Sequence, residues 1–206
     1  VLGPSDIIVK GSEDLTAIVQ PQSAMVIIDY SNGYVRGLVG GRGEKPNYER
    51  SFNRATQSKR QPGSTFKTVA AYAPAIDTGV ITPNSIFIDA PININGYAPK
   101  NHNNRYDGPI TAKEALKLSK NTVAVQVMNK VGPATSFKYL KQFGFTSLVE
   151  KKNINGKIYS DIGLPTALGG LTVGVTQLEM TAAYGTIANK GTYIEPTFYT
   201  KVEDHN

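Results

Sequence analysis

The sequence predicts an α/β layer structure in which helices flank an antiparallel sheet. An early β-hairpin is expected, with an apolar strand at Met25–Ile28, a turn at Asn32 and Gly33, and a second strand at Tyr34–Val39. Helical patterns outnumber strand patterns elsewhere, and a short edge strand is expected at Thr192–Ile194. With 206 residues, of which 40% are hydrophobic, the chain is long enough to bury a sizeable core.

The longest helical signal follows a Pro-Gly turn that ends at Gly63. Apolar residues recur there at helical spacing, at Phe66, Val69, Ala70, Ala73 and Ile76. Pro74 is expected to kink or end this helix, and Gly79 to stop it. Residues 80–108 have little periodicity and are rich in Asn, Pro and Gly, so extended surface loops are expected there.

Two capping boxes mark further helix starts, because each places a glutamate three residues after a threonine. They pair Thr111 with Glu114 and Thr176 with Glu179, and Gly191 is the expected stop of the second helix. Two more helices are expected in between, at 122–131 and 134–144.

Composition excludes several kinds of site. The formal net charge is +6, but the 22 Lys and Arg residues are spread along the chain, so no nucleic-acid partner is expected. Cysteine is absent, which excludes disulfides and thiolate chemistry. The two histidines, His102 and His205, lie in polar stretches and are expected to be solvated, so neither a metal nor a cofactor is predicted. No apolar run is long enough to span a bilayer.

The strongest chemical signal is the pair Ser64 and Lys67 at the start of the helix after Gly63. Their spacing puts both side chains on one helical face, about one turn apart. A lysine whose charge is disfavoured by burial can take the proton of a serine hydroxyl and so activate a nucleophile. The spacing alone is weak evidence, because it arises by chance about once in a chain of this length.

A second signal is Ser119-Lys120-Asn121, in the break between two expected helices. A hydroxyl and an amide held in one turn can relay a proton and bind a substrate amide. Capping of the next helix by Ser119 or Asn121 is at least as good an explanation on local grounds. The same spacing also occurs at Ser51 and Asn53, so position in the fold must choose between them.

Longer stretches carry a family resemblance. The runs "FNRATQSKRQPGSTFK", "LSKNTVAVQ" and "ALGGLTVGVTQLEMTAAYGTIANKGTYIEP" closely resemble the transpeptidase domain of the bifunctional, class A penicillin-binding proteins. The resemblance implies the penicillin-binding and serine β-lactamase-like fold. It also implies that residues 23–206 are the N-terminal portion of that domain, and that residues 1–22 are a linker or the start of the domain.

The resemblance implies a serine acyltransferase that acts on peptidoglycan stem peptides ending in D-Ala-D-Ala and is acylated by β-lactams. Ser64 corresponds to the nucleophile, and its backbone N–H to half of the oxyanion hole. Lys67 corresponds to the base, Ser119 to the group that passes the proton to the leaving amine, and Asn121 to the residue that positions Lys67 and the substrate amide. Ser51 and Asn53 are then a chance occurrence of the motif.

One departure from the family pattern concerns its third motif, Lys followed by Thr or Ser and then Gly. It occurs nowhere in this chain, and Lys190-Gly191-Thr192 has the residues in the wrong order. In the family this motif lines the opposite wall of the cleft. We therefore expect the domain to be incomplete in this chain and to be completed by its C-terminal remainder, as a second chain.

Three alternatives stay open at this stage. A D-Ala-D-Ala carboxypeptidase or a β-lactamase-like hydrolase shares the first two motifs, but the Glu-x-x-Leu-Asn segment of a serine β-lactamase is absent. A β-lactam sensor would keep the pocket without turnover. A structural interpretation makes Ser64 a helix cap and Lys67 a surface lysine. The resemblance favours the transpeptidase, on the extracytoplasmic face of a bacterial membrane, anchored by a segment outside this chain.

Overall fold

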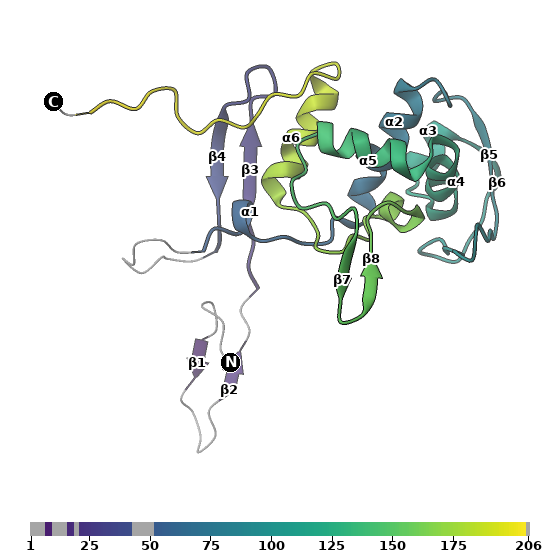
Figure 1. The fold of residues 1–206 in the computed structure, drawn as a ribbon, viewed down its shortest axis with the longest axis horizontal. Helices are drawn as coiled ribbons and strands as arrows, with labels where there is room; N and C mark the ends of the chain where they lie inside the picture. The colour runs from purple at the N-terminus through teal and green to yellow at the C-terminus, as the bar shows by residue number, and fades with distance from the viewer. Residues whose placement is uncertain (1–6, 10–15, 19–20, 43–51, 205–206) are drawn as a thin grey trace.

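The structure is a computed structural model that describes residues 7–9, 16–18, 21–42 and 52–204. A hairpin and a helical cluster lie side by side in it (Figure 1). The hairpin pairs β3 (Met25–Ile28) with β4 (Val35–Val39) in antiparallel register, as the sequence predicts. Short strands β1 (Ile7–Val9) and β2 (Thr16–Ile18) also pair antiparallel.

Helix α6 (Gln177–Ala188) packs against strand β3 of the hairpin (Figure 1). Val26 points inward and is buried, whereas Met25 and Ile27 on the opposite face are about half exposed. The capping box at the start of α6 is confirmed, because Thr176 Oγ1 accepts from the N–H of Glu179 at 3.2 Å and the Thr176 N–H donates back to the Glu179 carboxylate at 2.8 Å.

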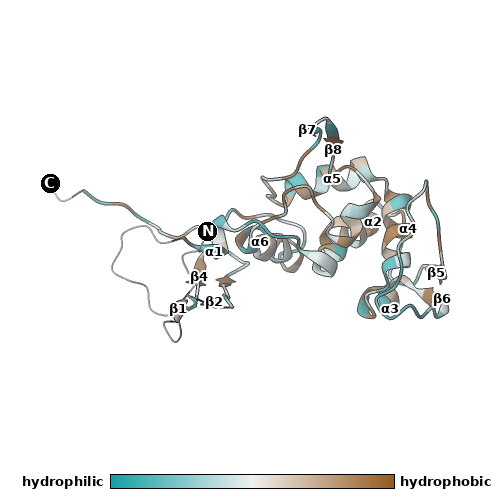
Figure 2. Ribbon diagram, turned by 90° about the horizontal axis from the view of Figure 1, so that it is seen from below, coloured by the Kyte–Doolittle hydropathy of each residue, from teal (hydrophilic) through white to brown (hydrophobic). Residues whose placement is uncertain are grey.

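The hydrophobic core surrounds α4 (Asn121–Val131), which is buried over most of its circumference. It packs against α5 (Pro133–Gln142), the 3₁₀ turn η3 (Leu164–Leu168) and the helical run that follows Gly63. Apolar residues are therefore found around most of this helix, as is typical of a central helix. Figure 2 shows hydrophobic residues along α4 and the helices beside it.

The helical run after Gly63 has three parts: the 3₁₀ turn η1 (Gly63–Thr65), the π-helical turn η2 (Thr68–Tyr72) and α2 (Ala73–Asp77). Pro74 has no N–H to donate to the Ala70 carbonyl. That carbonyl instead accepts from the buried Ser136 hydroxyl at 2.5 Å, and the Ala73 N–H bonds Thr68 O, five residues back. Pro74 therefore does not end the helix.

The π turn explains one wrong core prediction in this run. An extra residue in a helical turn rotates every side chain that follows it. Ala75 is consequently buried, while Ile76, which the uniform helical pattern predicts to be in the core, is 43% exposed. Gly79, with φ +71°, follows the end of α2 as expected.

Residues 80–108 are only partly loop, which corrects the expectation of extended loops throughout. Strand β5 (Ile86–Asp89) pairs antiparallel with β6 (Gly108–Thr111). Phe87 and Asp89 point inward and are buried, while the two isoleucines between and before them are exposed. The exposed isoleucines hide the alternation of apolar and polar residues by which a strand is recognised.

Helix α3 (Ala112–Lys117) starts where the sequence predicts, with Thr111 Oγ1 accepting from the N–H of Glu114 at 3.2 Å. The Glu114 carboxylate pairs with Lys117 rather than completing the box. A further hairpin, of β7 (Lys152–Ile154) and β8 (Lys157–Tyr159), turns at Asn155-Gly156, a dipeptide typical of tight hairpin turns.

The late strand expected at Thr192–Ile194 is absent from the described residues. The chain instead meets the first hairpin further on, where Thr197 forms a single parallel bridge with Tyr34. Tyr193 packs closely over Gly144, where a Cβ added to the glycine would lie within 2.7 Å of the tyrosine ring. Pro196 has no N–H that could donate to a neighbouring strand.

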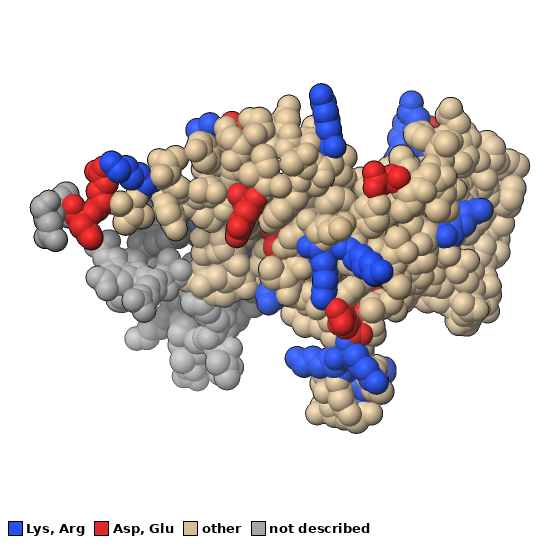
Figure 3. All heavy atoms as spheres, turned by 45° about the horizontal axis from the view of Figure 1, so that its top comes forward, with Lys and Arg blue, Asp and Glu red and all other residues tan. Residues whose placement is uncertain are grey.

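Two further observations concern the surface. Lys and Arg side chains are scattered over the face seen in Figure 3, with a local group on the projecting β7–β8 hairpin. In the described part of the chain, no helix is both long and apolar enough to cross a membrane.

Candidate active site

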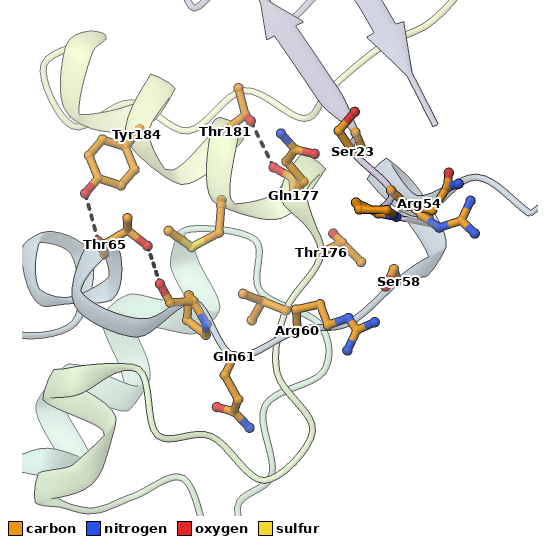
Figure 4. Close-up of a pocket in the computed structure, with 16 residues that line it drawn as sticks. Ser23, Arg54, Ser58, Arg60, Gln61, Thr65, Thr176, Gln177, Thr181 and Tyr184 are labelled. Carbon is orange, nitrogen blue, oxygen red and sulfur yellow. Dashed lines mark hydrogen bonds between the residues drawn. The ribbon is translucent and has the colours of Figure 1, made fainter. Parts of the chain in front are cut away.

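Ser64 lies at the exposed start of the helical run, directly after a turn in which Gly63 has φ +58°. Backbone N–H groups in the first turn of a helix have no acceptor within that helix, so they are free for an external oxygen. The Thr65 hydroxyl donates to Pro62 O at 2.6 Å, and Tyr184 of α6 donates to Thr65 O at 2.8 Å (Figure 4). The turn is thereby fixed on two sides of Ser64.

A distant segment, residues 169–175, also holds this turn. The Gln61 side chain bonds both backbone groups of Leu171, accepting from its N–H at 2.7 Å. Gly169 packs against the backbone of Gly63, where a Cβ would lie 2.5 Å from the nitrogen and oxygen of that residue. Only glycine allows this approach, since its φ of +75° is also in the left-handed region.

Lys67 is one turn further along and is 1% exposed. Its Nζ donates to Asn121 Oδ1 at 2.6 Å, to Ser119 Oγ at 2.8 Å and to Ser119 O at 2.5 Å. These contacts use the three protons of an ammonium group, and the Ser64 hydroxyl is not among the Lys67 partners. Burial lowers the pKa of Lys67 to about 8.

Ser119 lies in the turn between α3 and α4, as the sequence predicts. Its backbone N–H donates to Leu116 O at 3.0 Å, which closes the end of α3, and its φ is +55°. A non-glycine residue in the left-handed region costs on the order of 1–3 kcal/mol and is frequent at functional sites. Ser119 is an exposed residue, and its hydroxyl accepts from Lys67 Nζ.

Asn121 begins α4, and its amide is oriented by two partners. Nδ2 donates to Lys100 O at 2.7 Å, which leaves Oδ1 facing Lys67 Nζ. The helix is not capped by the Asn121 side chain, contrary to the local alternative. The structure thus brings Lys67, Ser119 and Asn121 together, and the exposed Ser64 precedes Lys67 by three residues in the same helical run.

The competing motif behaves differently. Asn53 caps α1 (Arg54–Gln57), where its Oδ1 accepts from the Ala55 N–H at 3.0 Å, and Ser51 lies outside the described residues. His102 is exposed, and His205 also lies outside the described residues. Within the described ranges, no cluster of three or more His, Cys, Asp or Glu residues is arranged to hold a metal.

A cavity of about 1050 Å³ lies between α1, α6, the turn before Ser64 and the residues that precede β3 (Figure 4). Thr65 and Pro62 line it, but none of the four predicted site residues does. The predicted site residues thus lie outside the lining of this cavity.

Residues 23–206 match the family described as "Penicillin binding protein transpeptidase domain". The chain belongs to this family. The resemblance stated from the motifs is therefore confirmed, and so is the fold class, since helices and antiparallel strands build the structure.

Among curated relatives of this transpeptidase-family chain, penicillin-binding protein 1A of Clostridium tetani is 39% identical over 201 residues, which cover 94% of this chain and 25% of the relative. Penicillin-binding protein 1F of Bacillus subtilis is 37% identical over 185 residues, 90% of this chain and 24% of the relative. The chain thus spans about a quarter of the length of these relatives.

Solved structures agree with this assignment. Penicillin-binding protein 1A from Haemophilus influenzae superposes with a TM-score of 0.70 at 32% identity, over 88% of this chain and 25% of that one. PonA1 from Mycobacterium tuberculosis, solved in complex with penicillin V, gives a TM-score of 0.69 at 28% identity, over 85% of this chain and 46% of that one.

Three polar residues close to the site carry no sequence signal of their own: Asp89, Asn101 and the middle residue of the second motif, Lys120. Asp89 ends a strand whose sequence lacks the usual alternation, and Asn101 is one of many asparagines in its segment. Burial is the property that distinguishes them, and no local pattern reveals it.

Proposed function

We propose that this transpeptidase-family chain carries the nucleophile half of a serine D,D-transpeptidase that cross-links peptidoglycan stem peptides. The observation that carries the proposal is the buried Lys67, whose Nζ contacts both Ser119 Oγ and Asn121 Oδ1 one turn from an exposed serine. An amine whose charge is disfavoured by burial suits a general base.

The first half-reaction is acylation of Ser64. Neutral Lys67 has two N–H donors and a lone pair, so it can keep two of its three oxygen contacts while it accepts the Ser64 proton. The Ser64 oxygen attacks the carbonyl between the two terminal D-alanines, and the developing oxyanion accepts from the Ser64 backbone N–H. Ser119 passes the proton to the departing D-alanine amine, which leaves an ester on Ser64.

The second half-reaction reverses these proton transfers. An amine of a neighbouring stem peptide attacks the ester carbonyl and gives up a proton, which Ser119 passes to Lys67. Lys67 then protonates the Ser64 oxygen as the ester C–O bond breaks, so that a new amide forms and the Ser64 hydroxyl is regenerated. Asn121 holds the substrate amide through its carboxamide while it orients Lys67. A β-lactam enters the first half-reaction and stays as the acyl group. No cofactor takes part in this scheme.

We also propose that the C-terminal remainder of the domain, as a second chain, completes the cleft. It would supply the Lys-Thr/Ser-Gly strand with the substrate carboxylate contact and the other oxyanion donor. The exposed apolar face of the β3–β4 hairpin supports this, since Met25, Ile27 and Val39 are 47–50% exposed there. The proposed location is the extracytoplasmic face of a bacterial membrane.

Intact-mass analysis after exposure to penicillin tests the nucleophile. The natural full-length protein should gain one penicillin mass, and Ser64→Ala should gain none. An adduct that survives Ser64→Ala would refute the choice of nucleophile. Co-expression of this chain with a segment that carries Lys-Thr/Ser-Gly should restore the adduct if the two form one domain.

Cross-linked product from a lipid-linked peptidoglycan substrate separates the transpeptidase from its alternatives. Binding without product would indicate a sensor. Rapid turnover of a chromogenic cephalosporin, in place of a stable adduct, would indicate a hydrolase.

A further inference from the structure

Lys120, the middle residue of the Ser119-Lys120-Asn121 turn, points into the protein and is 6% exposed. Its Nζ lies 2.8 Å from Asp89 Oδ2 and also contacts the Asp107 carboxylate. A buried ammonium is costly unless it is paired. In the sequence, this paired lysine lies directly between Ser119 and Asn121, the two residues that contact Lys67.

Asp89, at the end of β5, is 1% exposed and is fully surrounded by donors. Besides Lys120 it accepts from Thr122 Oγ1 at 2.5 Å, from Asn101 Nδ2 at 2.7 Å and from the Asp107 N–H at 3.0 Å. Burial opposes its charge, but these donors outweigh burial and hold the pKa of Asp89 below its usual value. Its carboxylate is therefore charged at neutral pH.

Asn101 connects this carboxylate to the second motif. Its Nδ2 donates to Asp89, and its Oδ1 accepts from the backbone N–H of Asn121 at 2.8 Å and of Thr122 at 3.4 Å. It thus caps the start of α4 from a distant loop, since the side chain of Lys120 at the N-cap makes no capping bond. The next residue back, Lys100, supplies the carbonyl that orients the Asn121 amide.

These contacts fix the side chains of Ser119 and Asn121, whose positions helix geometry alone does not determine. Ser119 adopts a left-handed backbone that costs free energy, so neighbouring contacts must stabilise it. The next residue, Lys120, is held inward by its ion pair with Asp89. The residue after that, Asn121, is held by Asn101 through its backbone N–H and by Lys100 O through its side-chain amide. The Ser119 hydroxyl and the Asn121 carbonyl then face Lys67 Nζ.

We propose that Asp89, Lys120 and Asn101 are positioning residues that hold Ser119 and Asn121 in contact with Lys67. The inference rests on the proposed function, because it assigns the group to acylation of Ser64. A purely stabilising role is the alternative. Buried ion pairs are frequently no more stabilising than apolar residues of equal volume, so their presence beside a strained turn favours a role in geometry.

The test uses the natural full-length protein and a fluorescent penicillin, with the acylation rate constant separated from the binding constant by varying the penicillin concentration. Lys120→Met leaves the buried Asp89 carboxylate without its ionic partner, whereas Asp89→Asn leaves Lys120 paired with Asp107 alone. The double variant removes both charges. Val131→Ala, at the far end of the same helix, is the matched control for loss of core packing, because Val131 is 7% exposed and belongs to the core cluster.

We expect the double variant to fold and to acylate at least tenfold more slowly than wild type, with an unchanged penicillin binding constant. Val131→Ala should melt at a lower temperature and acylate at the wild-type rate when folded. A crystal structure of the double variant should show residue 119 outside the left-handed region, which tests the positioning independently of activity.

Two results would overturn this inference and leave the proposed function intact. One is a folded double variant that acylates at the wild-type rate, and the other is a structure in which Ser119 keeps its conformation. Failure of the proposed function looks different, because the adduct would then be missing from wild type or would survive Ser64→Ala.

Discussion

The pH dependence of acylation gives the sharpest test of the role of Lys67. With a pKa lowered to about 8 by burial, Lys67 is about 10% neutral at pH 7 and about 90% neutral at pH 9. If neutral Lys67 is the base, the acylation rate constant should rise about tenfold between these pH values and then level off. An ordinary lysine, with a pKa of 10.5, would give about a hundredfold rise with no plateau.

The assay is stopped-flow acylation of the natural full-length protein by a fluorescent penicillin from pH 6 to 10. Lys67→Met should lose the pH-dependent rise together with most of the rate. Solvolysis of the penicillin without protein is subtracted at each pH. A flat profile in wild type would refute Lys67 as the base, and a tenfold rise per pH unit that continues beyond pH 9 would refute the effect of burial.

The same pKa predicts how Lys67 changes folding stability. Between pH 8 and 10.5 the unfolded lysine binds a proton that the folded one has released, so stability rises with pH in that window. The contribution is about 1.6 kcal/mol between pH 8 and 9.5, because the slope is half of its full value of about 1.4 kcal/mol per pH unit at pH 8 and approaches that value above it. The free energy of unfolding, measured in urea at both pH values, should show this rise in wild type relative to Lys67→Met. An equal change of the unfolding free energy with pH in the two proteins would contradict the prediction.

Three further predictions concern a buried hydroxyl, a close backbone contact and a helix cap. Tyr72→Phe removes a buried hydroxyl that has no hydrogen-bond partner in the described part of the chain, so it should stabilise the protein by about 1 kcal/mol in urea unfolding; a loss of stability would contradict this. Gly169→Ala should lower the melting temperature and slow acylation, because its Cβ would clash with the Gly63 backbone, whereas Gly79→Ala has strain at φ +71° but open space and should leave acylation unchanged. Thr176→Ala should cost about 1 kcal/mol through loss of the capping box, and Thr176→Ser should retain it; equal stabilities would argue against the cap.

Much of the local structure could be predicted, because its causes lie within a few residues of each other. The β3–β4 hairpin follows from apolar strands around Asn32-Gly33, and α6 from the threonine and glutamate of its capping box. The predictions that failed depend on distant contacts. Ile76 is exposed because of a π turn in which the Ala70 carbonyl is satisfied by Ser136, 66 residues away.

The residues of the candidate site also differ in whether their roles could be predicted from local spacing or depended on other information. The spacing of Ser64 and Lys67 could be interpreted directly, because helical geometry fixes which side chains share a face. The choice of Ser119 and Asn121 over Ser51 and Asn53 depended on family resemblance. The structure adds that Lys67 contacts the first pair, while Asn53 caps a helix.

The sequence by itself determined the family, the helix that carries Ser64 and Lys67, and the capped start of α6. Those features depend on short-range spacing and on long runs of characteristic residues. Only the tertiary structure decided that Lys67 is buried and that it meets residues 52 and 54 positions further along the chain. Burial is also what lowers its pKa, since desolvation arises only when remote segments close around the amine.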